Sequence, residues 1–456
     1  MKKKYLFSIL VILIVFIAGC SSEECNCNVE VTPANALLHY LNNNDSTYHW
    51  ELKNTYEIEG VQAYDLILTS QTWHDHVWKH QLTVIVPEEV KYNDALLFIT
   101  GGSLKKGNPN MSDAEDRTAK FMASIAKDNN AITSIIRQVP MQPIFNGRVE
   151  DEIISLTLHN YKNDGDLTWP LLFPMVKSAV HGMDALQEFA SKELSTELDK
   201  FVLSGASKRG WTTWLTGASD PRVKAIAPMV IDVLNMPASL EYHKDAWGDY
   251  SPEIQDYVNL GLPQEIESDS GANIVAMIDP YSYRNNLTMP KMIFIGTNDP
   301  YWPVDAIKNY FDSIPGENYI HYVPNAGHGL DAKNNDQSIR ALSSFFGNTI
   351  SNINYPVLDW EISRVENSYK IEVSSTADKL VDAVYWSASS PDRDFRDNEW
   401  SGENFGAEGL ASVSWEELFP ETGYRAFYID LIYKDVNGDE YSKSTRMFVV
   451  DSLQLL

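Results

Sequence analysis

Three residues that lie far apart in the chain could together perform nucleophilic catalysis: Ser207, Asp299 and His328. Ser207 follows the apolar run 201–205 and precedes an amphipathic stretch, which is the pattern of a strand, a sharp turn and a helix. Asp299 ends a second apolar run, and His328 lies between two glycines after a third. A serine, an aspartate and a histidine therefore follow three expected strands in that order.

These residue types suit the hydrolysis of an ester or an amide. A serine hydroxyl is a poor nucleophile at neutral pH unless an imidazole accepts its proton. The imidazole needs an acceptor on its other nitrogen, which fixes its tautomer and stabilises its charged form. We therefore assign Ser207 as the nucleophile, His328 as the general base and then acid, and Asp299 as the residue that orients the imidazole. This chemistry calls for no cofactor.

Each of the three residues also has a simpler interpretation. Ser207 could stand in an ordinary turn between a strand and a helix, Asp299 could cap a helix at 304–312, and His328 could be a turn residue. The catalytic interpretation is favoured because all three occur at strand ends, in the order expected of α/β-hydrolases. Asp299 is preferred to Asp305 as the acid because Asp299 directly ends the apolar strand.

The turn around the serine differs from the usual G-x-S-x-G pattern. Arg209 stands where a second glycine is usual, and the glycine comes one place later, at Gly210. A bulky residue at 209 must point away from the strand that it would otherwise crowd. Some serine esterases, including glucuronoyl esterases, have a similar G-x-S-[RK]-x-G elbow. Lys208 and Arg209 could lend positive charge to an anionic substrate or to the oxyanion, or they could be solvated or paired cations.

Backbone amides are expected to stabilise the oxyanion that forms during the reaction. The amide of Lys208, directly after the nucleophile, is the first expected donor. The second should come from a loop after an earlier strand, and the expected strand 94–100 runs directly into Gly101 and Gly102. Glycine lets a backbone amide approach a ligand closely, so we assign Gly102 to this role; a plain tight turn is the alternative.

The elements around these residues alternate between strand and helix patterns. A capping box at 112–115 predicts a helix to about residue 127, and 174–194 reads as a second helix. Strand-like runs lie between these helices and on either side of the serine turn. This alternation predicts an α/β-hydrolase fold, with a mainly parallel sheet and helices on both faces. The aromatic and acidic segment at about 232–290 is expected to form a cap over the site.

A change of pattern near residue 350 predicts a second domain. From Val357 onward, short alternating stretches are separated by Asp, Asn, Gly and Ser turns, as in an immunoglobulin-like β-sandwich. We therefore expect a hydrolase domain at 35–350 and a C-terminal β-sandwich domain at 354–456. The sandwich could bind a carbohydrate or a partner, or it could be a stabilising appendage.

The N-terminus has the pattern of a bacterial lipoprotein signal. Three lysines are followed by an almost wholly apolar stretch to Ile17, and Ile17-Ala18-Gly19-Cys20 matches the lipobox. We expect a signal peptide at 1–19, a polar tether at 20–34, and lipidation of Cys20. The protein would then be anchored to a membrane of the bacterial cell envelope, facing the periplasm or the outside.

Composition excludes several other classes of protein. A formal charge of −27 argues against binding to nucleic acid. All three cysteines lie in the leader and tether, so the body cannot be a cysteine hydrolase or a thiolate–zinc protein. His74, His76 and His80 are expected on one face of an edge hairpin, where an exposed polar face is favoured over a metal site because no further ligand stands at a matching spacing. No metal site is predicted.

Across nearly the whole mature chain, the sequence resembles the PhoPQ-activated pathogenicity-related protein family, which includes eukaryotic autocrine proliferation repressor proteins. The resemblance implies an α/β-hydrolase fold followed by a β-sandwich, and it puts Ser207, Asp299 and His328 at the family's candidate triad positions. Where the family usually has an acidic residue and aromatics after the aspartate, this chain has Pro300-Tyr301-Trp302. The matching stretches are Gln142-Pro143, Glu150-Asp151, 168–184, 204–210, Ile231-Asp232, 279–281, 296–299, 323–329 and 393–396.

Two classes of function follow from the sequence. The first is an envelope-anchored serine hydrolase that cleaves an ester or amide in a small molecule, glycan or peptide. The second is a secreted or anchored binding or signalling protein that keeps the fold without the activity, because a fold alone does not determine chemistry. The complete set of Ser207, Asp299 and His328 favours the enzyme.

Overall fold

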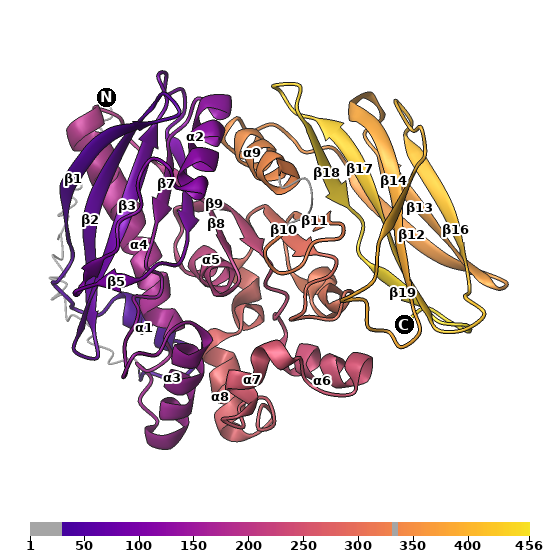
Figure 1. The fold of residues 1–456 in the computed structure, drawn as a ribbon, viewed down its shortest axis with the longest axis horizontal. Helices are drawn as coiled ribbons and strands as arrows, with labels where there is room; N and C mark the ends of the chain where they lie inside the picture. Colours follow the sequence, from indigo (N-terminus) through magenta and orange to yellow (C-terminus); the bar gives the residue numbers. More distant parts are fainter. Residues whose placement is uncertain (1–29, 331–335) are drawn as a thin grey trace, which may run out of the picture. The chain divides into compact units, whose positions relative to one another are not determined.

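The computed structural model describes residues 30–330 and 336–456, and Thr32–Leu456 form one compact unit around a large mixed sheet (Figure 1). The strands of the hydrolase part follow the spatial order β1-β2-β3-β7-β4-β8-β9-β10-β11. Their bounds are β1 (His49–Ile58), β2 (Val61–Trp73), β3 (His76–Val86), β4 (Asp94–Ile99), β7 (Thr133–Ile136), β8 (Lys200–Ala206), β9 (Val223–Met229), β10 (Lys291–Gly296) and β11 (Asn318–Val323).

The strands from β7 to β11 run parallel to one another, whereas β1, β2 and β3 are antiparallel. Strands β7 and β10 are buried along their full length, and β10 accordingly reads as a nearly continuous apolar run rather than as an alternating one. Strand β8 lies between β4 and β9 in the middle of the sheet. Its C-terminal end is therefore held on both sides, which gives the serine turn a rigid base.

Helices cover both faces of the sheet, as the alternating pattern predicts. Helices α4 (Leu172–Phe189) and α5 (Lys208–Ser219) pack in one apolar core, and α2 (Arg117–Asn129) and α9 (Asp336–Ile350) pack in another. The mainly parallel sheet, its two helical layers and the turn at Ser207 form an α/β-hydrolase fold. The remaining short elements of this part are α1 (Ala36–Leu41), β5 (Leu104–Lys105) and β6 (Asn108–Pro109).

The predicted start of α2 is wrong by one turn. The helix begins at Arg117, and its N-cap is Asp116, whose side chain accepts a hydrogen bond of 2.9 Å from the amide of Ala119. The amide of Ser112 is used elsewhere, because it donates to the side chain of Gln81 on β3. A tertiary contact therefore decides against the capping box that the sequence contains.

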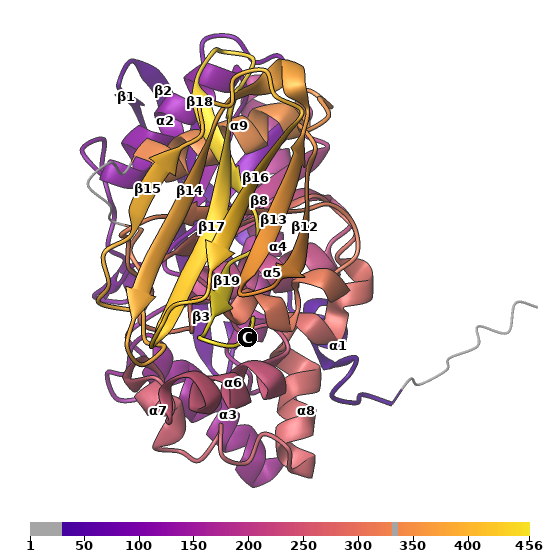
Figure 2. The same cartoon turned by 90° about the vertical axis from the view of Figure 1, so that its right-hand side faces the viewer.

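The segment 232–290 forms a group of short helices at one end of the sheet. It contains α6 (Met236–Trp247), α7 (Gln255–Val258) and α8 (Asp269–Ile278), which gather with α3 (Asp151–Asp164) at the lower end of both views (Figures 1 and 2). The expected helix at 304–312 is replaced by two short 3-10 turns, Ala306–Asn309 and Phe311–Ser313. Asp299 is therefore not the cap of that helix.

The C-terminal strands form a β-sandwich, which faces the viewer in Figure 2. One layer contains β12 (Leu358–Val365), β13 (Ser368–Ser375) and β16 (Ser412–Leu418); the other contains β14 (Leu380–Ser390), β15 (Ser401–Asn404), β17 (Tyr424–Lys434), β18 (Glu440–Ser444) and β19 (Phe448–Val450). Three residues without strand structure, 445–447, separate β18 from β19. Strand β18 pairs with β11 at Ile320 and Ser444, so the second layer continues the hydrolase sheet.

The expected exposed histidine face is also wrong. His74 lies in the turn between β2 and β3, and β3 is an interior strand because β7 pairs with its other side. The side chain of His80 is fully buried, with Nδ1 at 2.9 Å from the carbonyl of Arg137 and Nε2 at 2.9 Å from the hydroxyl of Ser70. His80 is therefore a hydrogen-bonded core residue.

The expected signal peptide, Cys20 and most of the expected tether lie outside the described residues. Over residues 30–330 and 336–456, none of the helices combines the length and the apolar character that crossing a membrane requires.

Candidate active site

Ser207 stands at the apex of the turn between β8 and α5. Its backbone adopts φ 59° and ψ −129°, a conformation that is costly for a residue with a side chain and that persists only where the surroundings hold it. The amide of Ser207 donates a hydrogen bond of 2.8 Å to the carbonyl of Met229 on β9, and its carbonyl accepts from the amide of Trp211 in α5. The turn is thus tied to a strand on one side and a helix on the other.

Two glycines make this turn sterically possible. A Cβ atom at Gly205 would lie 2.9 Å from the carbonyl oxygen of Ile99, and one at Gly210 would lie 2.7 Å from the side chain of Ile231. Strand and helix approach each other closely here: the nearest atom to a Cβ at Gly205 would be the backbone carbonyl oxygen of Arg209, at 2.8 Å, and a Cβ at Gly210 would lie 2.9 Å from the carbonyl oxygen of Gly205. This explains why the second glycine of the motif comes one place late. The side chain of Arg209 reaches the segment after β7, where its Nε donates a hydrogen bond to the carbonyl of Val139.

Asp299 and His328 form a hydrogen-bonded pair. Nδ1 of His328 lies 2.9 Å from one carboxylate oxygen of Asp299 and 3.1 Å from the other. The side chain of Asp299 is only 3% exposed, and its Oδ1 also accepts a hydrogen bond of 2.9 Å from the amide of Tyr301. Asp299 thus holds Nδ1 of the imidazole in place, and its part in catalysis stays a prediction.

The other nitrogen of His328 is the one that would face a nucleophile. Its Nε2 is buried and has no hydrogen-bond partner among the described residues. His328 and Ser207 line the same cavity. In hydrolases without a bound substrate, the hydrogen bond between base and nucleophile is often long and tightens only in the complex.

Asp305, the alternative acid, takes part in a different set of contacts. Its Oδ2 accepts hydrogen bonds from the hydroxyl of Tyr242 at 2.6 Å and from Nζ of Lys308 at 3.0 Å. Its side chain is buried beneath α6 and is not bonded to His328. Of the two aspartates, only Asp299 has the geometry to orient the imidazole.

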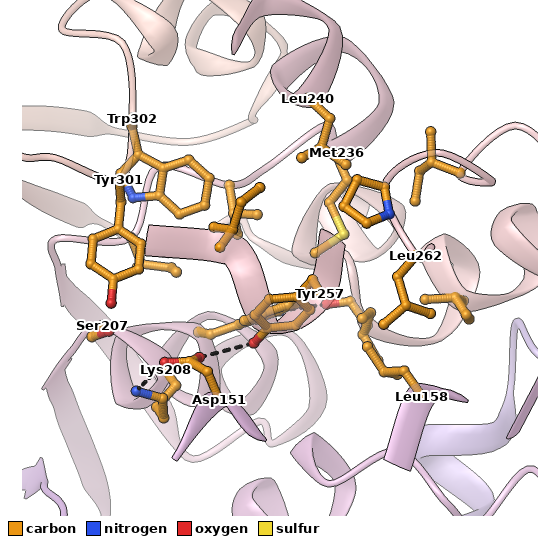
Figure 3. Close-up of a pocket in the computed structure, with 18 of the residues that line it drawn as sticks. Asp151, Leu158, Ser207, Lys208, Met236, Leu240, Tyr257, Leu262, Tyr301 and Trp302 are labelled. Atoms are coloured by element: carbon orange, nitrogen blue, oxygen red, sulfur yellow. Dashed lines mark hydrogen bonds and ion pairs between the residues drawn. The ribbon is translucent and has the colours of Figure 1, made fainter. Parts of the chain in front are cut away.

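The cavity beside Ser207 is enclosed mainly by apolar side chains from the segment 232–290 (Figure 3). Two aromatic residues, Tyr301 and Trp302, form one wall, and the hydroxyl of Tyr301 points toward Ser207 in the close-up. The ring of Tyr301 also stacks on the imidazole of His328, with centroids 4.1 Å apart. The remaining apolar lining residues are Leu158, Trp211, Ile231, Val233, Met236, Leu240, Ile254, Leu262, Pro263, Ile266, Ile274 and Ile278.

Lys208 and Arg209 are paired cations. Nζ of Lys208 lies 2.9 Å from Glu150 and 3.0 Å from Asp151, and its side chain is 8% exposed. Arg209 lies 2.7 Å from the other carboxylate oxygen of Glu150. Burial by itself would raise the pKa of Glu150, but its hydrogen bond and charge pairing with Arg209 and its pairing with Lys208 outweigh this effect and lower the pKa to about 2. Two acids therefore balance two bases directly behind the nucleophile.

Sequence reasoning did not assign roles to these acids or to the cap residue bound to them. The hydroxyl of Tyr257 in α7 donates a hydrogen bond of 2.9 Å to Asp151, which is itself paired with Lys208. This chain of contacts ties the cap segment to the residue next to the nucleophile. The sequence did contain a signal of this pairing, because two adjacent acids stand at 150 and 151 and two adjacent cations at 208 and 209.

Comparison with known proteins identifies the family. The family model of the PhoPQ-activated pathogenicity-related protein matches residues 37–396. The chain belongs to this family. It is also 31% identical over 441 residues to autocrine proliferation repressor protein A of Dictyostelium discoideum, covering 89% of this chain and 88% of that protein.

The solved structures similar to this family member include an esterase and a peptidase. Acetyl xylan esterase 1 from Thermoanaerobacterium sp. is 17% identical, with 69% of this chain and 93% of that one covered and a TM-score of 0.48. The acylaminoacyl peptidase of Pyrococcus horikoshii is 15% identical, with 69% and 43% covered and a TM-score of 0.40. The likeness concerns the fold.

The two expected oxyanion donors differ in their surroundings. Lys208 is the first residue of α5, so its amide belongs to the first helical turn, where N–H groups have no partner within the helix. Gly102 adopts φ 148°, lies against Gln138, and its carbonyl accepts a hydrogen bond from the side chain of Gln142. Gly102 is not among the described residues that line the cavity with Ser207. Its role as a donor stays a prediction.

The family match extends into the sandwich, to a loop that supports the acid. The side-chain amide of Asn298 donates hydrogen bonds to the carbonyls of Phe395, Arg396 and Asn398, the last at 2.7 Å. Asn298 directly precedes Asp299. In this family member, a loop between β14 and β15 of the sandwich therefore braces the segment that carries the acid.

Proposed function

We propose that this protein is a serine hydrolase that cleaves an ester or an amide through Ser207, His328 and Asp299. The observation that carries the proposal is the hydrogen bonding of His328. Asp299 bonds to Nδ1, whereas Nε2 has no hydrogen-bond partner among the described residues. His328 also lines the same cavity as Ser207. The strained backbone of Ser207 supports the same role, because strain of this kind concentrates at functional sites.

The proposed reaction has two steps. Oγ of Ser207 attacks the substrate carbonyl carbon while Nε2 of His328 takes the hydroxyl proton, and the negative oxygen that forms faces the amide of Lys208. The bond to the leaving group then breaks, and His328 returns the proton to that group. Water next attacks the acyl-enzyme and gives its proton to His328. Collapse releases the acid, and Ser207 regains its proton.

Labelling with a fluorophosphonate probe tests the proposal, because such probes react covalently with activated serines. We expect the purified protein to be labelled at Ser207 and to hydrolyse small activated esters. Ser207→Ala should lose labelling and at least about a thousandfold of kcat/KM. Ser204→Ala is a matched control within β8, since the hydroxyl of Ser204 bonds to the carbonyl of Ala227. Unchanged ester turnover in folded Ser207→Ala protein would sink the proposal.

A non-catalytic binding or signalling role is the second candidate. The observation in its favour is the name of the relative that is 31% identical, an autocrine proliferation repressor. A properly folded protein that reacts with no probe and cleaves no ester would support this role.

The proposed location is the bacterial cell envelope, with a lipid on Cys20 as the link to the membrane. The lipobox at 17–20 supports this anchor. The formal charge of −27 argues against nucleic acid as a partner. A substrate that is a small molecule, a glycan or a peptide would then be met outside the cytoplasm.

A further inference from the structure

We infer that the cavity beside Ser207 receives an uncharged, apolar acyl group, so that the substrate is a neutral ester or amide of an aliphatic or aromatic acid. This inference rests on the proposed hydrolase function and specifies its substrate class. It concerns the residues around Ser207 rather than the catalytic residues themselves.

The far side of the cavity offers only apolar contacts. It is formed by residues from the cap, which include side chains of α6 and of the turn after α7, and from α3 (Figure 3). Those labelled in the close-up are Leu158, Met236, Leu240 and Leu262. Each has less than a tenth of its surface exposed. Burying apolar surface against such walls gives binding energy that a polar group could not replace.

The charges at the near end of the cavity cancel. Lys208 lines the cavity, but its Nζ is held between Glu150 and Asp151. Asp151 also lines the cavity, and it is bound by Lys208 and by the hydroxyl of Tyr257. An anionic acyl group would need a cation that is already paired, and a cationic group would have to compete with Lys208. The site therefore favours a neutral substrate.

The acyl part fits this cavity better than the leaving group for a chemical reason. The acyl group stays bound to Oγ of Ser207 between the two steps, whereas the leaving group must depart after the first. A cavity that adjoins Ser207 and is covered by the cap suits the group that remains. Apolar burial there holds the acyl-enzyme in place until water attacks.

A series of 4-nitrophenyl esters tests the inference with the purified full-length protein. With acetate, butyrate and hexanoate, we expect kcat/KM to rise by at least roughly tenfold from the shortest to the longest chain. The hemisuccinate, an anion of about the same length as the butyrate, should be cleaved at least about tenfold more slowly than the butyrate. An acetate preference, or equal rates for hemisuccinate and butyrate, would overturn the inference and leave the hydrolase proposal standing.

Substitutions at Leu240 test whether the cap causes the preference for longer acyl chains. Leu240→Asp puts a charge on the apolar wall, and the hexanoate-to-acetate ratio of kcat/KM should collapse to near one. Leu240→Ala, which is milder for folding, should lower the same ratio by roughly threefold or more. Leu410→Asp is the matched control, because Leu410 is 47% exposed in the sandwich. An unchanged ratio in both Leu240 variants would overturn the inference, whereas a wild-type protein that cleaves no ester and takes no probe would overturn both proposals.

Discussion

The imidazole of His328 stacks on the phenol ring of Tyr301, with centroids 4.1 Å apart and planes 29° from parallel. Tyr301 follows Asp299 by two residues, and its amide donates to the same carboxylate that holds Nδ1 of His328. One short segment thus fixes the imidazole by a hydrogen bond that Nδ1 donates to Asp299 and by a ring contact with Tyr301. Both contacts should matter for turnover, since a general base must keep its direction when it becomes charged.

Replacing the Tyr301 ring tests the stacking contact. Tyr301→Leu should lower kcat by about three- to tenfold, as expected for the loss of an aromatic pair, while Tyr301→Phe should keep most of the activity. Steady-state kinetics on one ester, with kcat and KM resolved, is the measurement. Equal losses in the two variants would assign the effect to the hydroxyl instead of the ring.

The identity of the acid can be tested by two matched substitutions. Asp299→Asn should cost roughly a thousandfold or more in kcat/KM, because the amide holds His328 in the wrong tautomer. Asp305→Asn should instead lower stability by about 1–3 kcal/mol, because it disturbs the contacts with Tyr242 and Lys308. Ester kinetics and urea unfolding separate the two effects, and the reverse ranking in kinetics would move the acid to Asp305.

The contact of Asn298 with the sandwich loop should influence catalysis as well as stability. Asn298→Ala removes the three hydrogen bonds to the sandwich loop and the one that Asn298 accepts from the hydroxyl of Thr297, so kcat should fall by roughly tenfold or more even where the protein stays folded. Asn437→Ala is the control, since it removes a single bond between the sandwich and the carbonyl of Asp128 near the end of α2. Equal kcat values for the two variants would limit the sandwich to a stabilising role.

The pKa of Glu150 makes a prediction about acid stability. Its folded-state pKa of about 2 lies below the ordinary value of 4.5, so protonation favours the unfolded chain. The stabilisation from this carboxylate is complete above pH 4.5 and is lost as the pH falls toward 2. Glu150→Gln should therefore flatten the decline of Tm over this window. Glu267→Gln, at an exposed position, should leave the decline as in wild type.

Membrane attachment tests the lipobox. Wild-type protein should sediment with membranes, and Cys20→Ser should release it, because the acyl chains alone would hold the acidic body at a bilayer. Mass spectrometry of the mature N-terminus is the direct measurement. An unmodified N-terminus at Met1, or a cut elsewhere than before Cys20, would contradict the prediction.

The sequence by itself determined the hydrolase fold, the C-terminal sandwich and the order of Ser207, Asp299 and His328. These follow from local signals: apolar runs form the buried strands, and short polar turns end them. The shift of the second glycine to position 210 was also visible in the sequence. Its cause is the side chain of Ile231, which leaves no room for a Cβ atom at this position.

Only the tertiary structure decided which long-range partners the polar residues have. From the sequence, Lys208 could lend its charge to the substrate or be a solvated or paired cation. In the structure it is paired with Glu150 and Asp151. His80 reads as an exposed strand residue, but it is buried and bonded to the hydroxyl of Ser70 and the carbonyl of Arg137. The capping box at 112–115 fails because the amide of Ser112 bonds to Gln81. Periodicity and spacing report the environment along one element, whereas these outcomes depend on which elements pack together, and that depends on the whole chain.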